Sequence, residues 1–190
     1  SITSKCVTDT VKSYETLGMQ YADKYKGVDQ RLGLLSLAGV KYITVAHNSQ
    51  VAKDVSSMGD VPYGVEKLRK KGNITLYKNK YALPFAYAYD SYMTEEEYLA
   101  LPEDKRPYAL LRALVVSEEE AEKRQIDKYM RHISQEELLH LDEAHMKSDI
   151  DVRRKNASTS FERDTSGFRS EVICDGPGAV FYSVPYDASW

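Results

Sequence analysis

Three histidines, His132, His140 and His145, lie close together in the second half of the chain and raise the question of a metal site. A zinc site on a helix places two histidines four residues apart, so that both side chains leave the same face. His140 and His145 are five residues apart, and no cysteine lies near them. Because a structural zinc site needs about four ligands, we interpret these residues as helix-surface pairs, Glu136 with His140 and Asp142 with His145. We expect no metal and no other cofactor.

Two runs of three glutamates could supply the paired carboxylates of acid–base chemistry. They are Glu95–Glu97 and Glu118–Glu120, and each follows directly after a hydroxyl residue. Negative charge in the first turn of a helix is favoured by the exposed N–H groups and the helix dipole, so capping explains both runs without catalysis. The chain contains no G-x-S-x-G, P-loop or G-x-G-x-x-G motif. We therefore expect no catalytic residue in this chain.

The hydroxyl residues predict where helices begin. Thr94, Ser117 and Ser134 each stand three residues before a glutamate, which is the spacing of a capping box. In such a box the hydroxyl accepts a hydrogen bond from the third N–H, and the glutamate carboxylate accepts one from the cap N–H. Apolar residues at helical spacing follow each box, which predicts helices over about 95–101, 118–130 and 135–147.

A cluster of tyrosines around one aspartate, Tyr87, Tyr89, Asp90 and Tyr92, is the main candidate for binding. The chain has fifteen tyrosines against four phenylalanines and one tryptophan. In a strand, Phe85, Tyr87 and Tyr89 point to the same face. This row could be an aromatic platform for a sugar ring, with Asp90 bonding the sugar hydroxyl groups. Such a row is more often packed under a helix, and the helix predicted after it is a ready cover.

The first half of the chain is predicted to alternate between helices and strands. A helix over Asp29–Ala38 ends at Gly39, which can adopt the left-handed conformation, and a strand over Val40–Ala46 follows directly. The polar stretch 47–63 is predicted to be a loop. Gly64–Lys71 is predicted to be a short basic helix, and the Gly-Asn pair after it a turn. Two further strands are predicted, over Ile74–Asn79 and Phe85–Tyr89.

The second half is predicted to change from helices to strands. Pro107 can open a helix that runs to Leu111 or Leu114, although Leu114–Val116 could instead be a short buried strand. The polar segment Asp149–Ser160 is the best candidate for a linker or hinge. Beyond it, Phe168–Cys174 and Ala179–Pro185 flank a Gly-Pro-Gly turn and predict a β-hairpin.

Together these elements predict an α+β fold. We expect a mixed sheet with covering helices over residues 1–155. An isolated hairpin is marginal in water, so the strands of residues 156–190 must pair elsewhere or be the opening hairpin of a β-rich, sandwich-like module that stops early. A chain of 190 residues fits one domain, or one domain and a piece of another. It is long enough to bury a core without disulfide bonds or structural metals.

Charge and hydropathy exclude several classes of protein. The net charge is −3 and no basic block is longer than Leu68–Lys71, so we expect no binding to nucleic acid. The start of the chain lacks the apolar segment of a signal peptide. The longest apolar stretch, Tyr108–Val116, is nine residues and contains Arg112, whereas a membrane span needs about 20. We therefore expect neither a signal peptide nor a membrane span in the sequence as given.

Two cysteines, Cys6 and Cys174, lie far apart in the sequence. They could pair only if the fold brings the first segment beside the last strands, within about 7 Å between Cα atoms. Two cysteines make no disulfide framework, so we interpret them as separate small apolar residues and leave their pairing open.

Three blocks of the sequence resemble the YfhO family of bacterial multi-pass membrane proteins. The central block, Asn79–Val116, has the N-x-x-ALP segment, the Y-D-S-Y element, the short acidic helix and the leucine-rich helix. Upstream, LAGVKYITV (Leu37–Val45) and the later ITLYKN resemble the G-V-K-Y and Y-x-N strands of the family. Downstream, GAVFYSVPYDASW (Gly178–Trp190) is similar to the strand ending in P-Y-D-x-x-W, with Ala188-Ser189 where a glycine is expected.

The resemblance implies a polytopic glycosyltransferase that uses lipid-linked sugars to decorate cell-envelope polymers, such as lipoteichoic acid in Gram-positive bacteria. This chain would be its extracytoplasmic domain, with its own transmembrane domain as one partner and an envelope polymer or glycan as another. The catalytic carboxylate of that class is expected in the membrane part, so none is assigned here. The substrate-binding candidates are the tyrosine cluster and the final motif: Tyr87, Tyr89, Asp90, Tyr92, Tyr186, Asp187 and Trp190.

Two roles are consistent with a non-catalytic domain of this kind. It could dock or orient the acceptor, or brace the membrane part. Alternatively, it could be an interaction module that recruits a partner protein of the envelope. A free-standing hydrolase ranks below both.

Overall fold

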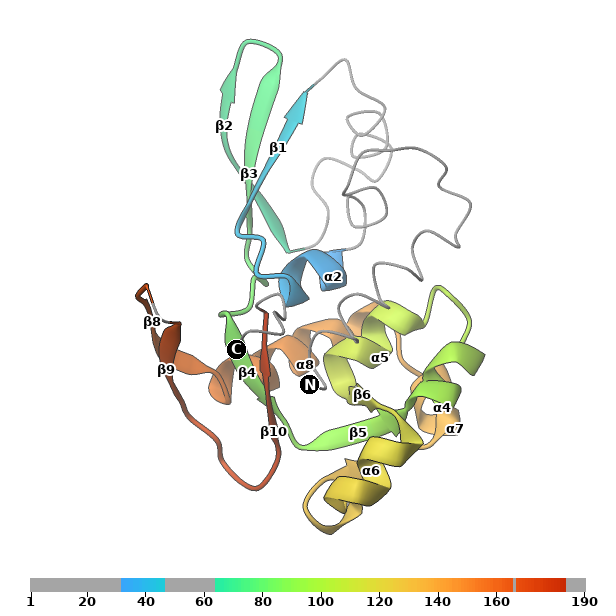
Figure 1. Ribbon diagram of the computed structural model, residues 1–190. Coiled ribbons are helices and arrows are strands. Elements are labelled where there is room, and N and C mark those ends of the chain that lie inside the picture. The colour runs from blue at the N-terminus through green and yellow to red at the C-terminus, as the bar shows by residue number, and fades with distance from the viewer. Residues whose placement is uncertain (1–31, 47–63, 166, 184–190) are drawn as a thin grey trace. The chain divides into compact units, whose positions relative to one another are not determined.

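The computed structural model describes residues 32–46, 64–165 and 167–183 (Figure 1). They belong to two compact units, Tyr14–Ala82 and Leu83–Trp190, the second of which also includes Ser1–Ser13. Helices and strands occur in comparable amounts, so the predicted α+β class is confirmed. The loop predicted over 47–63, the first residues of the helix predicted from Asp29, and Cys6 lie outside the described residues.

The unit Tyr14–Ala82 contains a three-stranded antiparallel sheet. Its described elements are α2 (Leu32–Leu37), β1 (Tyr42–Ala46), β2 (Val65–Lys71) and β3 (Ile74–Asn79), and the strand order is β1-β3-β2. Gly39 ends α2 with a φ of 69°, as predicted, since glycine adopts this left-handed conformation without a steric penalty. The predictions of this helix and of strands β1 and β3 are therefore confirmed.

The prediction of a basic helix over Gly64–Lys71 is wrong, because Val65–Lys71 forms strand β2. Lys71 pairs with Ile74, so Gly72 and Asn73 form a two-residue hairpin turn. Gly72 has a φ of 58°, as such a turn requires. The turn fixes β2 against β3, and this tertiary pairing outweighs the helix propensity of the lysines and arginine.

The unit from Leu83 onward packs short sheets against helices. Its first elements are β4 (Ala86–Tyr89), β5 (Ser91–Thr94), α4 (Glu95–Ala100), α5 (Arg106–Arg112), β6 (Leu114–Val116), α6 (Glu118–Arg124), η1 (Ile126–Lys128) and β7 (Arg131–His132). They are followed by α7 (Gln135–Leu139), α8 (Glu143–Lys155), β8 (Ser158–Arg163), β9 (Phe168–Val172) and β10 (Ala179–Tyr182). Helix α5 ends at Arg112, within the range predicted for the helix at Pro107, and the alternative of a short strand over Leu114–Val116 is confirmed.

Three parallel strands in the order β6-β5-β7 each lead directly into a helix. The caps of these helices are the predicted hydroxyl residues. Thr94 and Ser134 make complete capping boxes, whereas at Ser117 only the hydroxyl half is formed. There the Glu120 carboxylate accepts instead from Arg124, at 2.6 Å. The helix predicted over 118–130 ends at Arg124, because Gln125 adopts a left-handed conformation with a φ of 51°.

The helix predicted over 135–147 is wrong as a single element. Helix α7 stops at Leu139, and Asp142 caps a new helix, α8, by accepting hydrogen bonds from the N–H groups of Ala144 and His145. Helix α8 continues through Lys155, so the linker predicted over Asp149–Ser160 is wrong as well. The segment is polar in sequence, yet Asp149 and Arg153 are buried beside Ile150.

The hairpin predicted between Phe168–Cys174 and Ala179–Pro185 is also wrong. Strand β9 pairs with β8, whereas β10 pairs with β4, more than eighty residues earlier in the chain. Segments β4 and β10 therefore lie side by side in Figure 1. All four residues of β4 are buried, and Phe181 of β10 packs against the rings of Tyr87 and Tyr89, so this long-range contact outweighs the local turn. Whether residues 156–190 open a further β-rich module stays a prediction.

No helix in the described part of the chain combines the length and the apolarity needed to cross a membrane. The core of the unit from Leu83 onward is formed by side chains of β4, β5, the helices and their connections. Its largest fully buried side chains are Tyr87, Met93, Leu101, Leu111, Ile126, Ile133, Leu138 and Ile150.

The pairing of β10 with β4 can be tested at Gly178. A Cβ atom at this position would lie 2.2 Å from the carbonyl oxygen of Tyr89, which is backbone and cannot move aside freely. We expect Gly178→Ala to lower the free energy of unfolding by about 1–3 kcal/mol, as overpacking does. Gly176→Ala is the matched control, since nothing lies within 4 Å of its Cβ position. Equal urea-denaturation curves for the two variants would contradict the pairing.

Candidate functional site

The predicted aromatic platform lies in the core. Tyr87 and Tyr89 are 0% and 4% exposed, and Tyr92 is buried as well. The rings of Tyr87 and Tyr89 are on the same face, as predicted, with centroids 5.7 Å apart. Phe85, at the start of the row, is 53% exposed. The two buried tyrosine rings cannot stack on a sugar in this arrangement. Tyr186, Asp187 and Trp190 lie outside the described residues.

The tyrosine row is organised around the end of α5. The last four carbonyl groups of a helix have no partner within it. Here the carbonyl of Ala109 accepts from the N–H of Ala113, at 2.9 Å. The carbonyl of Leu110 accepts from the hydroxyl of Tyr89, at 2.7 Å. Side chains from other elements thus complete this helix end.

Arg153 of α8 satisfies the remaining two carbonyls. Its side chain is 3% exposed. The guanidinium donates from Nε to the carbonyl of Leu111 at 3.1 Å and from Nη2 to that of Arg112 at 2.8 Å. Nη1 donates to the carbonyl of Ala88 in β4, at 2.6 Å. One planar side chain therefore joins α8, α5 and β4, and it places a positive charge at the negative end of the α5 dipole.

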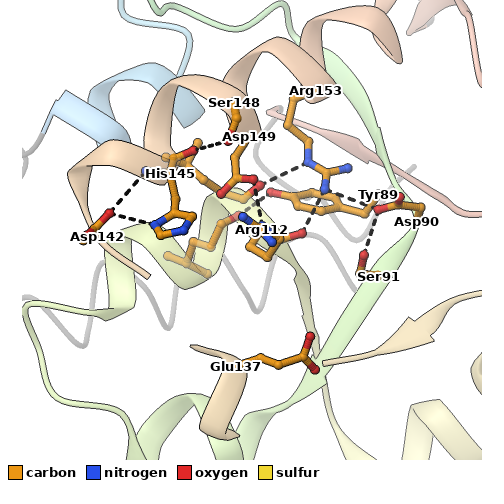
Figure 2. A network of polar contacts seen from close by, with 12 residues as sticks. Tyr89, Asp90, Ser91, Arg112, Glu137, Asp142, His145, Ser148, Asp149 and Arg153 are labelled. Carbon is orange, nitrogen blue, oxygen red and sulfur yellow. Dashed lines mark hydrogen bonds and ion pairs between the residues drawn. The ribbon is translucent and has the colours of Figure 1, made fainter. Parts of the chain in front are cut away.

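The face of the Tyr89 ring packs against this guanidinium. The Arg153 Cζ atom lies 4.3 Å from the ring centroid, within the range of a cation–π interaction (Figure 2). Tyr89 thus contacts α5 through its hydroxyl and α8 through its ring. This double role explains why a tyrosine, with an apolar body and a polar tip, stands at a buried position.

Asp149 lies one turn before Arg153 on α8 and binds the last residue of α5. Its Oδ1 accepts from Nε of Arg112 at 2.7 Å, and its Oδ2 is buried with no hydrogen-bond partner in the described part of the chain. Burial raises the pKa of Asp149 above its ordinary value, although the hydrogen bond and charge of Arg112 act in the opposite direction. The Asp149 carboxyl therefore binds Arg112 of α5 through Oδ1, while Oδ2 accepts no hydrogen bond from the described residues.

Asp90 marks the exposed rim of this cluster (Figure 2). Its carboxylate is 70% exposed, lies 3.4 Å from Nη2 of Arg153 and accepts from the Ser91 hydroxyl at 2.8 Å. Partial burial raises the pKa of Asp90, but the Ser91 hydrogen bond and the Arg153 charge together hold it below its ordinary value. Asp90 therefore presents a charged oxygen at the surface.

The three histidines have separate partners, and His145 lies on α8 beside Asp149 (Figure 2). His132 ends β7 and contacts the Glu97 carboxylate, with 2.9 Å between Nε2 and Oε2. His145 pairs with Asp142 at 2.7 Å as predicted, whereas the His140 ring contacts the backbone carbonyl of Glu136. Within the described ranges no three His, Cys, Asp or Glu side chains gather as metal ligands do.

The Glu97 carboxylate is fixed from two sides. It closes the Thr94 capping box and contacts His132, at the edge where the parallel strands end. Burial raises the pKa of Glu97, but the Thr94 N–H and the His132 ring together hold it below its ordinary value. Thus one carboxylate of the Glu95–Glu97 run is a helix cap in the structure, as the capping interpretation predicts.

A second aromatic row reaches the surface, and sequence reasoning missed it. Successive rings of Phe85, Phe161, Phe168 and Tyr182 have centroids 5.1 to 5.2 Å apart, and none of the four is buried. They come from the start of β4 and from β8, β9 and β10. We refer to these four residues as the surface aromatic row. Phe161 and Phe168 lie on either side of the β8–β9 turn and are close in sequence. Their other neighbours in the row, Phe85 and Tyr182, are brought to them by long-range contacts.

The arrangement has two distinct parts. The buried cluster of Tyr89, Arg112, Asp149 and Arg153 holds three elements together and has its donors directed at backbone carbonyls and a carboxylate. The surface aromatic row and the Asp90 carboxylate are the groups that an external molecule can reach. The first part is suited to stability and the second to binding.

The buried cluster is tested by Arg153→Met, which keeps the length of the side chain and removes its donors. Three backbone carbonyls would lose their donors and Asp90 its ion-pair partner, so we expect the free energy of unfolding to fall by about 3–5 kcal/mol. Lys147→Met removes the same charge from an exposed site on α8, where an ion pair contributes little. Chemical denaturation of both variants is the measurement. A loss no larger for Arg153→Met than for Lys147→Met would contradict the assignment.

Comparison with known proteins gives one match. The family model described as "Bacterial membrane protein YfhO" matches residues 1–170, which is most of the chain. No curated protein and no solved structure matches it. The match agrees with the resemblance carried by the sequence blocks around β1, β3 and β4–β6. The chain therefore belongs to the YfhO family of bacterial membrane proteins.

Proposed function

We propose that this chain is the extracytoplasmic domain of a membrane glycosyltransferase that transfers lipid-linked sugars to a cell-envelope polymer such as lipoteichoic acid. The family match over residues 1–170 supports the membrane-protein context. The resemblance to polytopic enzymes of this class supports the reaction. The domain itself is non-catalytic, and it docks the acceptor or braces the membrane part.

The surface aromatic row carries this proposal. Four neighbouring rings at the surface offer the flat apolar area on which sugar rings or apolar groups pack. The buried tyrosines support binding indirectly, since Tyr87 and Tyr89 pack against Phe181 of β10, the strand that carries Tyr182. Asp90 supplies an exposed carboxylate for hydroxyl groups. Tyr186, Asp187 and Trp190 stay binding candidates from the sequence.

A second function is favoured by the composition of the same row. Three of its four members are phenylalanines, which have no polar group for a sugar hydroxyl and are typical of contacts between proteins. The alternative is therefore an interaction module that recruits a partner protein of the envelope. Both functions use the surface aromatic row and differ in what it binds.

Phe85→Asp in the full-length protein distinguishes these functions. Leu99→Asp is the matched control, because both side chains are 53% exposed and Leu99 lies outside the row. If the row docks the acceptor, Phe85→Asp lowers sugar incorporation into the polymer at least tenfold, a loss of about 1.4 kcal/mol of binding, while Leu99→Asp does not. If the row recruits a protein, Phe85→Asp abolishes co-purification of that protein. Unchanged sugar transfer and unchanged co-purification would contradict both functions.

The extracytoplasmic location is tested with Cys174, an exposed free cysteine. A maleimide that cannot cross membranes should label the full-length protein in intact cells, and the labelling of this site should be absent in Cys174→Ser. The measurement is the difference between the two proteins, with Cys6→Ser in both so that only one of these cysteines reacts. Labelling of Cys174 only after cell lysis would place the domain on the other side of the membrane.

A further inference from the structure

The two compact units carry opposite charge. Residues 14–82 contain eleven Lys and Arg against six Asp and Glu, a net charge of +5. The rest of the chain contains fifteen Lys and Arg against twenty-three Asp and Glu, a net charge of −8. The overall charge of −3 hides this separation. A basic unit in an acidic chain points to an anionic partner of that unit.

The positive charge is concentrated on and beside the three-stranded sheet. Its described residues carry seven basic side chains, all exposed: Lys41, Lys67, Arg69, Lys70, Lys71, Lys78 and Lys80. Glu66 is the acidic residue in this described part of the unit, and it lies 3.7 Å from Lys80 in a solvent-exposed pair. Six cations are thus left in excess. Most of these cations lie on β2. A strand directs them to the two faces of a sheet, whereas the predicted helix would have distributed them around its axis.

Strand register shows which side chains share a face. Opposed residues of antiparallel strands point to the same side of the sheet. Tyr42 is opposite Lys78, and Lys78 is opposite Glu66. In the next rows, Leu76 is opposite Arg69 and Ile74 is opposite Lys71. We refer to the face that these residues share as the outer face: Tyr42, Glu66, Arg69, Lys71, Ile74, Leu76 and Lys78.

The exposure of the residues agrees with this assignment. On the other face, Val45, Thr75 and Asn79 are buried. On the outer face, Tyr42 and Ile74 are about half exposed, and so is Leu68 at the β2 bulge. The outer face therefore combines cations with large apolar side chains that are open to solvent.

We propose that the outer face binds an anionic lipid bilayer, with Arg69, Lys71 and Lys78 against the headgroups and Tyr42, Leu68 and Ile74 reaching between them. Basic residues near an anionic membrane surface contribute about 1 kcal/mol each. Tyrosine and aliphatic side chains contribute by entering the interfacial region. The exposed apolar residues favour a bilayer over a soluble polyanion, which would gain nothing from them. Membership of a membrane-protein family keeps this surface near a bilayer, independently of sugar transfer.

The test uses the purified 190-residue chain and vesicles of phosphatidylglycerol and phosphatidylcholine in equal parts, with vesicles of phosphatidylcholine alone as reference. We expect binding to the anionic vesicles only, and a steep decrease as salt screens the charges. Arg69→Glu/Lys71→Glu/Lys78→Glu should lower the partition coefficient at least roughly a hundredfold. Lys123→Glu/Lys128→Glu/Arg169→Glu makes the same charge change at exposed sites of the other unit and should bind as the unmodified chain does.

Two further variants keep the test decisive. Glutamine at Arg69, Lys71 and Lys78 removes the charge with less risk to the sheet and should also weaken binding. Leu68→Ser/Ile74→Ser should weaken binding at every salt concentration. Equal binding to both kinds of vesicle, equal losses in the control variant, or binding to soluble polyphosphate without binding to vesicles would overturn the proposal. Loss of sugar transfer in the full-length protein plays no part in this test, so the two proposals can fail separately.

Discussion

The unit from Leu83 onward depends on the burial of one guanidinium group. A buried charge is tolerated only when its donors are satisfied, and Arg153 meets this condition with three backbone carbonyls and the face of Tyr89. Those carbonyls belong to β4 and to the last turn of α5. The helix end in turn needs external donors, because its own backbone cannot supply them. Arg153 and α5 therefore fix each other's position, and β4 is fixed with them.

The features predicted correctly from sequence are those decided by neighbouring residues. Thr94 and Ser134 cap their helices because box and helix lie within four residues, and Gly39 ends α2 for the same reason. The predictions are wrong where contacts with a distant segment determine the local structure. Asp149 and Arg153 look like part of a linker because their burial partners lie about forty to sixty-five residues away. Likewise β10 pairs with the distant strand β4 and not with β9, its neighbour in sequence.

The candidate site shows the same division. The shared face of Tyr87 and Tyr89 follows from strand periodicity, but their burial depends on β10, which no local pattern indicates. The surface aromatic row joins residues of four strands and needs the tertiary fold. The outer face of the basic sheet cannot be predicted from the sequence, because the sequence pattern of Gly64–Lys71 favours a helix. Its cations became a surface only through pairing with β3.

Hydrogen exchange measured by mass spectrometry tests the central role of Arg153 most directly. If one guanidinium joins α8, β4 and α5, these elements belong to one cooperative unit and open together. The account predicts that Arg153→Met lowers the protection of amide groups in Ala86–Tyr89, Arg106–Arg112 and Glu143–Lys155 by the same factor. A loss of protection confined to α8, with β4 and α5 unchanged, would contradict it.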